Sequence, residues 1–231
     1  MDEIINKSNK LLSDLKNHHP YSAEHSLRVL IYARILRKEA QKHDYFKKHL
    51  SGLDSELLDA GASMHDIGKL RIGLNILDKD GKLTDEEFAT VRKHPLYGKE
   101  ILEQRGLSVI DEMAEYHQEK WNGYGYPKGV SGKDIPLEGQ IGALADAYDA
   151  RTSKRAYGFV LSHEDTFDIL KKDAGIHFDP QLIRIFELVK DEFGNTLLWL
   201  QNAQESDILD YIKRGGLNND SSNRENELDS R

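Results

Sequence analysis

Apolar side chains recur with the period of an α-helix along most of this 231-residue chain. Residues 2–16 and about 22–41 each place a stripe of leucine and isoleucine at helical spacing, and Pro20 lies in the break between them. Further helices are expected from Asp54 to a stop at Gly68, from Thr84 to His94, from Ser108 to His117, from Leu137 to about 150, and over about 163–173, 180–193 and 196–213. The pattern predicts an all-α fold in a single domain.

Two metal-binding side chains, His65 and Asp66, are adjacent in an apolar run that halts at Gly68. Taken alone, such a pair is more often a hydrogen-bonded structural feature than a metal site. Four more residues of metal-binding type stand within or beside apolar segments, namely His25, His94, His117 and Asp146. Because neutral imidazoles and carboxylates are the ligand set of borderline divalent metals, the sequence favours a metal centre. The chain has no cysteine, which excludes a zinc site built from thiolates.

The composition restricts the classes of partner. A formal net charge of -8 argues against a groove for a nucleic acid polymer, but a metal and a few cations can still hold a nucleotide. No apolar run approaches the ~20 residues that span a bilayer, and the polar start of the chain lacks the apolar core of a signal peptide. We therefore expect a cytoplasmic protein with no membrane partner and no disulfide bonds.

The segment 121–129, WNGYGYPKG, is rich in glycine and aromatic residues. It is too apolar for a linker, so we expect it to fold over a site. Asp149 follows Asp146 by three residues and lies on the same helix face; a hydrogen bond that orients another group is favoured for it over direct metal binding. Six other histidines are expected at the surface or in caps: His18, His19, His43, His49, His163 and His177.

The order of these pieces resembles the HD-GYP family of metal-dependent phosphohydrolases. The resemblance covers about residues 20–190 and is carried by His25, His65-Asp66 with Ile67-Gly68-Lys69, His94-Pro95, His117-Gln118-Glu119, Gly125-Tyr126-Pro127 and Asp146. Shorter agreements occur at Ile76-Leu77, Gly81-Lys82-Leu83-Thr84 and Phe178-Asp179-Pro180. The resemblance implies one helical bundle of the HD superfamily over residues 20–214, with the glycine-rich GYP loop over a metal site. Residues 1–19 would form an N-terminal helix packed on the domain or leading into it, and residues 215–231 a disordered tail.

Active HD-GYP proteins hydrolyse cyclic di-GMP to pGpG or GMP at a centre of two or three metals, commonly iron or manganese. By position, the resemblance implies one ion held by His25, His65, Asp66 and Asp146, and a second held by Asp66, His94 and His117, with Asp66 as the bridge. Two such ions, ~3.5 to 4 Å apart, would activate a bridging hydroxide that attacks phosphorus in line. Asp66 and Lys69 would take part in catalysis, and the substrate contacts would come from Lys69, Tyr126 and Arg155.

Three departures from the family pattern bear on this site. Gln118 replaces the second histidine of a tandem pair and leaves at most a weak amide ligand, which predicts a weaker or more open second metal site. Tyr21 stands where members with three metals carry glutamate, and Glu24 faces elsewhere on a helix, so two ions are expected. After Arg155 the family usually has proline, here Ala156, and after the tyrosine a basic residue, here Gly158. The loss of that charge puts one phosphate contact in doubt, with either a lower affinity for cyclic di-GMP or a different substrate as the consequence.

Two other functions stay open at this point. The chain would hydrolyse another nucleotide, such as a hybrid cyclic GMP-AMP dinucleotide, by the same metal chemistry with a different base pocket. Alternatively, it would be a binding or interaction module with slow or no turnover, with the glycine-rich segment as its partner surface. The intact ligand set favours an enzyme. The chain holds no room for a receiver or sensory domain, so we expect any regulatory input to come from a separate protein. A homodimer is the other protein partner that stays open.

Overall fold

The computed structural model describes residues 1–154 and 160–215, and these residues are largely helical. Their α-helices are α1 (Asp2–His18), α2 (Pro20–Ala40), α3 (Asp44–Leu50), α4 (Ser55–Ser63), α5 (Leu74–Leu77), α6 (Asp85–Val91), α7 (His94–Gln104), α8 (Glu112–Tyr116), α9 (Leu137–Thr152), α10 (His163–Lys172), α11 (Pro180–Leu188), α12 (Lys190–Leu200) and α13 (Glu205–Lys213). Short 3-10 helices are η1 (Ile67–Arg71), η2 (Ser108–Ile110) and η3 (Gly132–Asp134). Within the described ranges the only strand-like pairing is one bridge between Ala174 and Phe178, so the predicted all-α fold is confirmed.

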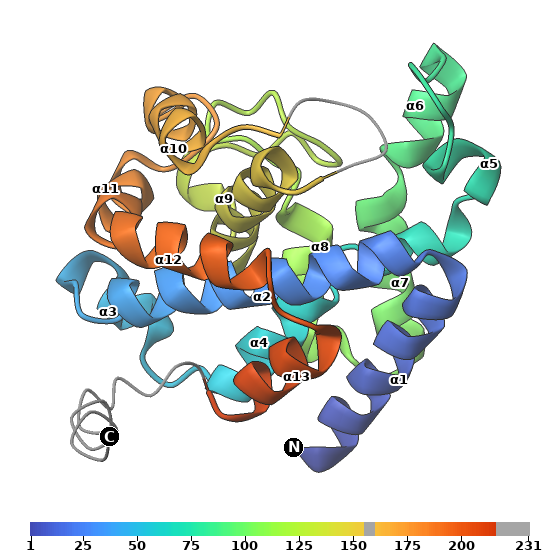
Figure 1. Cartoon of the computed structure of the whole chain (residues 1–231), viewed down its shortest axis with the longest axis horizontal. Coiled ribbons are helices and arrows are strands. Elements are labelled where there is room, and N and C mark those ends of the chain that lie inside the picture. Colours follow the sequence, from blue (N-terminus) through green and yellow to red (C-terminus); the bar gives the residue numbers. More distant parts are fainter. Residues whose placement is uncertain (155–159, 216–231) are drawn as a thin grey trace, which may run out of the picture.

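Helix α2 crosses the middle of the bundle, with other helices on both sides of it (Figure 1). It packs against α1, α4, α9, α11, α12 and α13. Its buried residues point in all directions around the helix and include Val29, Ile31 and Leu36. The single apolar stripe predicted for this segment was too narrow, because a helix surrounded by partners must be apolar around its whole circumference.

Two groups of buried side chains form the core. The larger joins α2 to α9 and to α10–α12, and it contains the packed rings of Tyr32, Tyr148, Phe186 and Phe193. The smaller joins α1, α4, η1 and α7 through residues that include Leu15. Fully burying side chains of this size stabilises the fold by ~1.5–3 kcal/mol each. Together the two groups fix α2, α4, α7 and α9, the helices that carry the candidate site.

The structure corrects the predicted position of the His-Asp pair. His65 and Asp66 lie in a turn between α4, which ends at Ser63, and η1, rather than inside one helix that continues to Gly68. The carbonyl oxygen of Ala62 accepts a hydrogen bond from Nδ1 of the His65 ring at 2.9 Å. A carbonyl at the end of a helix needs such an outside partner, and here the partner is the side chain that the turn presents.

Other predicted boundaries also differ. His94 lies at a helix junction as expected, but it begins α7, with Pro95 in the first turn. Helix α7 was not predicted, and neither were α3 and α5. Towards the C-terminus, two helices were predicted over about 180–193 and 196–213. The structure has three helices there, α11, α12 and α13, separated at Val189 and at residues 201–204. The Phe186 and Phe193 rings, on either side of the break at Val189, lie 5.0 Å from each other in one core.

No helix in the described part of the chain is long and apolar enough to cross a lipid bilayer. Helix α1 packs on α2, α4 and η1. Of the tail predicted to be disordered, only Gly215 belongs to the described residues.

Candidate metal centre

Six side chains that the sequence singles out meet at one point inside the bundle. They come from α2 (His25), the turn between α4 and η1 (His65 and Asp66), the start of α7 (His94), the residue after α8 (His117) and α9 (Asp146). Five of the six residues are at most 3% exposed, and the Asp146 side chain is 18% exposed. The helix packing therefore brings together donors that lie up to 121 positions apart in the sequence.

Asp66 lies between two pairs of imidazoles. Its Oδ2 atom is 3.5 Å from Nε2 of His65 and 3.7 Å from Nε2 of His25. Its Oδ1 atom is 3.4 Å from Nε2 of His94 and 4.0 Å from Nε2 of His117. Each pair forms with Asp66 a group whose potential ligand atoms all lie within 4.8 Å of one another. One carboxylate thus belongs to two sets of donors.

Asp146 extends the set that contains His25. Its Oδ1 atom lies 3.0 Å from Nε2 of His25. The other oxygen, Oδ2, accepts a hydrogen bond from Nε2 of Gln118 at 3.1 Å. Both oxygens of this carboxylate are therefore held on the side of the centre where His25 lies.

Hydrogen bonds at Nδ1 fix the orientation of all four histidine rings. The Nδ1 partners are groups that can only accept, so Nδ1 carries a proton in all four rings. In the neutral rings Nε2 presents a lone pair to the centre, and Nε2 of His25 does so once a metal replaces its proton. These partners are the Ala62 carbonyl for His65 at 2.9 Å, the Val91 carbonyl for His94 at 2.8 Å, the Met113 carbonyl for His117 at 3.0 Å and the Asp149 carboxylate for His25 at 2.7 Å. Proteins orient imidazole ligands of metals in this way.

The inward-facing nitrogens fit a cation better than any protein donor. Nε2 of His94 and Nε2 of His117 lie 3.0 Å apart, although neither has a proton to donate in this tautomer. Nε2 of His65 is buried and has no hydrogen-bond partner among the described residues. Buried lone pairs that converge without a donor are rare unless an ion binds them, so the donor set fits divalent metals.

The protonation of His94 and His117 agrees with this. Burial lowers the pKa of His94 to about 4. Burial, together with the neighbouring His94, lowers the pKa of His117 to about 3. Both rings are neutral at pH 7, the form that binds metals.

The pKa values of His25 and Asp66 shift in the direction opposite to the effect of burial. Burial alone would lower the pKa of His25, but its hydrogen bonds to Asp146 and Asp149 outweigh burial and raise the pKa to about 9. Burial alone would raise the pKa of Asp66, but the ammonium of Lys69 beside it holds the pKa well below its usual range. The centre therefore has ionised carboxylates, and a proton resides on His25 where a metal would replace it.

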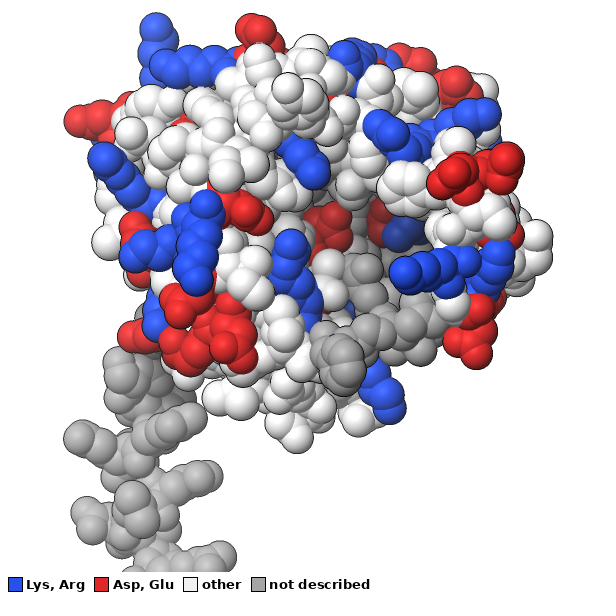
Figure 2. Space-filling model, turned by 90° about the horizontal axis from the view of Figure 1, so that it is seen from above, with Lys and Arg blue, Asp and Glu red and all other residues white. Residues whose placement is uncertain are grey.

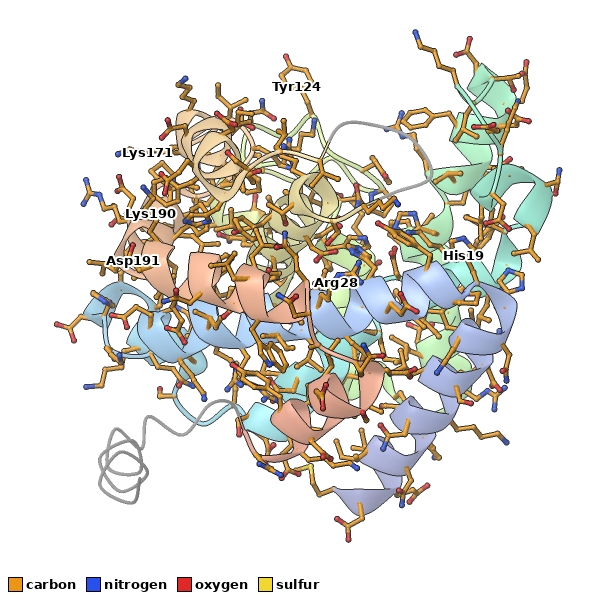
Figure 3. All side chains as sticks on the ribbon, in the orientation of Figure 1. His19, Arg28, Tyr124, Lys171, Lys190 and Asp191 are labelled. Carbon is orange, nitrogen blue, oxygen red and sulfur yellow. The ribbon has the colours of Figure 1, made fainter. Side chains whose placement is uncertain are left out.

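Asp149 supports His25 from the side away from the centre. This fully buried carboxylate accepts hydrogen bonds from Nδ1 of His25 at 2.7 Å, Nε of Arg28 at 2.8 Å and Oγ of Ser153 at 2.9 Å. The hydrogen bond predicted for Asp149 is therefore present, and its partner is His25. Arg28 was missed from the sequence, although its place three residues after His25 puts it on the same face of α2, where α2 meets α9 (Figure 3).

Gly68 allows η1 and α7 to approach closely beside the centre. A Cβ atom at this position would lie 1.9 Å from the carbonyl oxygen of His94 and 2.5 Å from the amide nitrogen of Gly98. The sequence reading of Gly68 as a helix stop therefore missed its main role. His94 can lie next to Asp66 because Gly68 has no side chain to keep the backbone of α7 away.

Lys69 and Tyr126, the predicted substrate contacts, both lie at the centre. Nζ of Lys69 is 2.5 Å from Oδ2 of Asp66, and its side chain is 21% exposed. The hydroxyl of Tyr126 donates to Oε1 of Gln118 at 2.9 Å. The guanidinium of Arg92, a residue missed from the sequence, lies over the Tyr126 ring at 4.7 Å from its centroid. Arg155, the third predicted contact, and Gly158 lie outside the described residues.

Glu119 holds the glycine-rich loop against the centre. The Oε1 atom of this buried carboxylate accepts hydrogen bonds from the amides of Lys128 at 2.7 Å and Gly129 at 3.0 Å. Tyr126 faces inward, whereas Tyr124 is 85% exposed and projects from the outer edge of the molecule (Figure 3). The loop thus lines the site on one side, as its composition predicted.

The molecular surface is hollowed on the face seen from above. Figure 2 shows acidic side chains deep in this hollow and lysine and arginine side chains around its edge.

Comparisons with known proteins agree with the fold and the motifs. A family model described as an HD domain matches residues 5–182. A probable cyclic di-GMP phosphodiesterase of Vibrio cholerae is 38% identical over 192 residues, which are 79% of this chain and 44% of that protein. A cyclic di-GMP phosphodiesterase of Pseudomonas aeruginosa is 34% identical over 79% of this chain and 43% of its own length. The chain spans less than half the length of these curated relatives.

Solved structures show the same fold. A cyclic GMP-AMP phosphodiesterase of V. cholerae matches 93% of this chain and 55% of its own at a TM-score of 0.61 and 16% identity. The HD domain of the Listeria monocytogenes phosphodiesterase PgpH, in complex with cyclic di-AMP, matches 84% of this chain and 98% of its own at a TM-score of 0.55 and 21% identity. With the HD family model over most of the chain and relatives above 30% identity, this protein belongs to the HD-GYP family of HD-domain proteins.

Proposed function

We propose that this chain is a metal-dependent phosphodiesterase that hydrolyses cyclic dinucleotides, with cyclic di-GMP as the first candidate and pGpG or GMP as the product. The observation that carries the proposal is the position of Asp66, whose two oxygens face two different pairs of imidazole nitrogens. This is the donor arrangement of a site for two neighbouring metal ions. The relatives named as cyclic di-GMP phosphodiesterases support the choice of substrate.

We assign two divalent ions to the centre. The first is held by His25, His65, Asp66 and Asp146, the second by Asp66, His94 and His117. Iron or manganese suits this mixture of imidazole and carboxylate donors. When bound, such ions supply an activated water and neutralise the charge that develops on the phosphate oxygens.

The chain's own residues would bind and orient the phosphodiester. Asp66 fixes the two donor sets relative to each other. Lys69 has its ammonium at the centre and is partly exposed, so it is placed to bind a phosphate oxygen. Tyr126 lines the mouth, and Arg155 is proposed as a second phosphate ligand. Because the donors themselves are buried, bulk water is excluded and these electrostatic contacts gain strength.

A second substrate is proposed beside cyclic di-GMP. A V. cholerae protein named 3'3'-cGAMP-specific phosphodiesterase 2 is 40% identical over 151 residues, 63% of this chain and 29% of that protein. The metal chemistry is the same for both dinucleotides, and Gly158 removes one basic residue that the family uses for cyclic di-GMP. Location in the cytoplasm, dimerisation and regulation by a separate protein remain predictions from the sequence.

The decisive experiment measures turnover and metal content together. Purified chain loaded with Mn²⁺, or with Fe²⁺ under anaerobic conditions, is incubated separately with cyclic di-GMP and 3'3'-cGAMP, and the products are separated by chromatography. We expect linear product from at least one substrate and two metal ions per chain by elemental analysis. Asp66→Ala should lose both ions and His94→Ala only the second, whereas the exposed His49→Ala should behave as the wild type.

Two outcomes would contradict the proposal. A chain that binds no metal under any of these conditions does not contain the proposed centre. A chain that binds metals and either dinucleotide tightly, but releases no product with either metal, is a binding module instead.

A further inference from the structure

Given the proposed metal centre, we infer that Gln118 is a positioning residue and not a metal ligand. Its amide holds the carboxylate of Asp146 and ties it to Tyr126 of the glycine-rich loop. The inference depends on the ligand assignment proposed above and goes beyond it, because it gives a role to a residue at which the chain departs from its family.

Chemistry fixes the orientation of the amide. The carboxylate of Asp146 can only accept, so the end of Gln118 that lies 3.1 Å from Asp146 must be the NH2 group. The other end is then the carbonyl oxygen, and it accepts the hydroxyl proton of Tyr126 at 2.9 Å. The opposite orientation would place two oxygens in contact without a proton between them.

This orientation engages both polar ends of the Gln118 amide. The carbonyl oxygen is the only atom of a neutral amide that binds metals well, and here it accepts the hydroxyl proton of Tyr126. The amide instead acts on the first ion's ligand set: it fixes Oδ2 of Asp146, while Oδ1 faces His25. The second set consequently has three residues, Asp66, His94 and His117.

The same amide couples the loop to the centre. The backbone of Gln118 also accepts a hydrogen bond from the amide of Tyr126 at 3.1 Å, so the two residues are joined twice. The exposed Arg92 covers the outer face of the Tyr126 ring. A continuous line of contacts therefore runs from Arg92 at the surface through Tyr126 and Gln118 to Asp146.

Gln118→Glu separates the two roles because they predict changes in opposite directions. Glutamate keeps the length and the acceptor for Tyr126, but it cannot donate to Asp146 and places a second negative charge beside it. If Gln118 positions Asp146, the Gln118→Glu substitution removes the hydrogen bond that holds this carboxylate, and the affinity for the first ion should fall by ~10- to 100-fold. If Gln118 were instead a metal ligand, the same substitution should tighten binding of the second ion, since a carboxylate is the better metal donor.

The readout is a titration of the metal-free protein with Mn²⁺ against a chromophoric chelator, which resolves the two affinities. Asp146→Asn identifies the step that belongs to the first ion, and His117→Ala identifies the second. Gln201→Glu, which adds the same charge at an exposed position, is the matched control. We expect the Gln118→Glu profile to resemble that of Asp146→Asn. A profile like that of the control, or a tighter second ion, would overturn the inference.

Tyr126→Phe provides a second test without a change in charge. It should weaken the first ion modestly, and this effect should disappear in a Gln118→Ala background, because both residues act through one chain of hydrogen bonds. Tighter binding of the second ion in Tyr126→Phe would show instead that the freed carbonyl is a ligand. The readout is metal affinity and not turnover, so a chain that binds both ions but hydrolyses nothing would refute the proposed function while still deciding the role of Gln118.

Discussion

Asp149 lies outside the centre, yet its Oδ2 atom is 2.7 Å from Nδ1 of His25 and so determines which nitrogen of that ring faces the metal donors. The carboxylate is completely buried, and it is also paired with Arg28, whose side chain is 14% exposed. One buried group therefore sets the tautomer of a proposed ligand and neutralises a neighbouring cation.

Asp149→Asn should weaken the first metal without removing any ligand. The new amide can donate its NH2 to Nδ1 of His25, which moves the ring proton to Nε2 and blocks the lone pair. We expect a ~10- to 100-fold loss of affinity for the first ion, together with lower thermal stability, because Arg28 loses its buried partner. Metal titration and thermal unfolding measure the two effects, with the exposed Asp191→Asn as control. An unchanged affinity would show that Asp149 does not set the tautomer.

Gly68→Ala should displace α7 and with it His94. The added Cβ would lie 1.9 Å from the His94 carbonyl, a contact with backbone that no rotamer change can relieve. We expect destabilisation of ~1–3 kcal/mol or more in urea unfolding and a selective loss of the second ion. Gly61→Ala is the milder control, because its Cβ would lie 3.3 Å from the carbonyl oxygen of Ile110. Equal effects of the two substitutions would argue against a special role for the η1–α7 crossing.

Glu119→Ala should release the glycine-rich loop. It removes the acceptor of the Lys128 and Gly129 amides, and a hydrogen bond to a charged group contributes ~1.5–3 kcal/mol. Hydrogen exchange should become faster at these two amides, while exchange in α2 and α9 stays slow. Glu164→Ala, which breaks an exposed ion pair with Lys190, is the control and should change little. Protection of the loop amides at the wild-type level would contradict this account of the loop.

His177→Gln should make the stability of the fold less sensitive to acid. Burial, aided by the nearby Lys120, lowers the pKa of His177 to about 4, whereas an unfolded histidine titrates at ~6.5. Between these values the unfolded chain binds more protons than the folded one, so the stability present above pH 6.5 is lost as the pH falls towards 4. Urea unfolding at pH 7, 6 and 5 should show a smaller decline for the variant than for the wild type or for His49→Gln. An identical decline would mean that His177 does not contribute to acid sensitivity.

The helical class and most of the site residues could be predicted from the sequence. Segments such as 2–16 and 137–150 carry apolar residues at helical spacing, and this is a local property that the corresponding helices α1 and α9 reproduce. The donors His25, His94, His117 and Asp146 were recognisable because polar groups of metal-binding type stand out in apolar surroundings. Their chemistry belongs to the side chains themselves and does not depend on the fold.

Residues whose role depends on contacts between distant segments were missed or misread. Arg28 and Arg92 resemble ordinary surface cations until Asp149 and Tyr126 are placed beside them. The sequence predicts Gly68 as a helix stop, but in the structure its lack of a side chain makes room for the backbone of α7. Gln118 was read only as a weak ligand, because the sequence does not say which ends of its amide meet Asp146 and Tyr126.

By itself, the sequence determined that this chain is helical, that it carries imidazole and carboxylate donors in the order of its family, and where that order is broken. The family resemblance implied that Asp66 joins two sets of donors, but only the tertiary structure decided the distances from Asp66 to the two pairs of histidines and which nitrogen of each ring faces it. The physical reason is the sequence separation over which each property is determined. Helical period and donor type are properties of neighbouring residues, whereas a contact between His25 and Asp146 depends on how whole helices pack around a shared core.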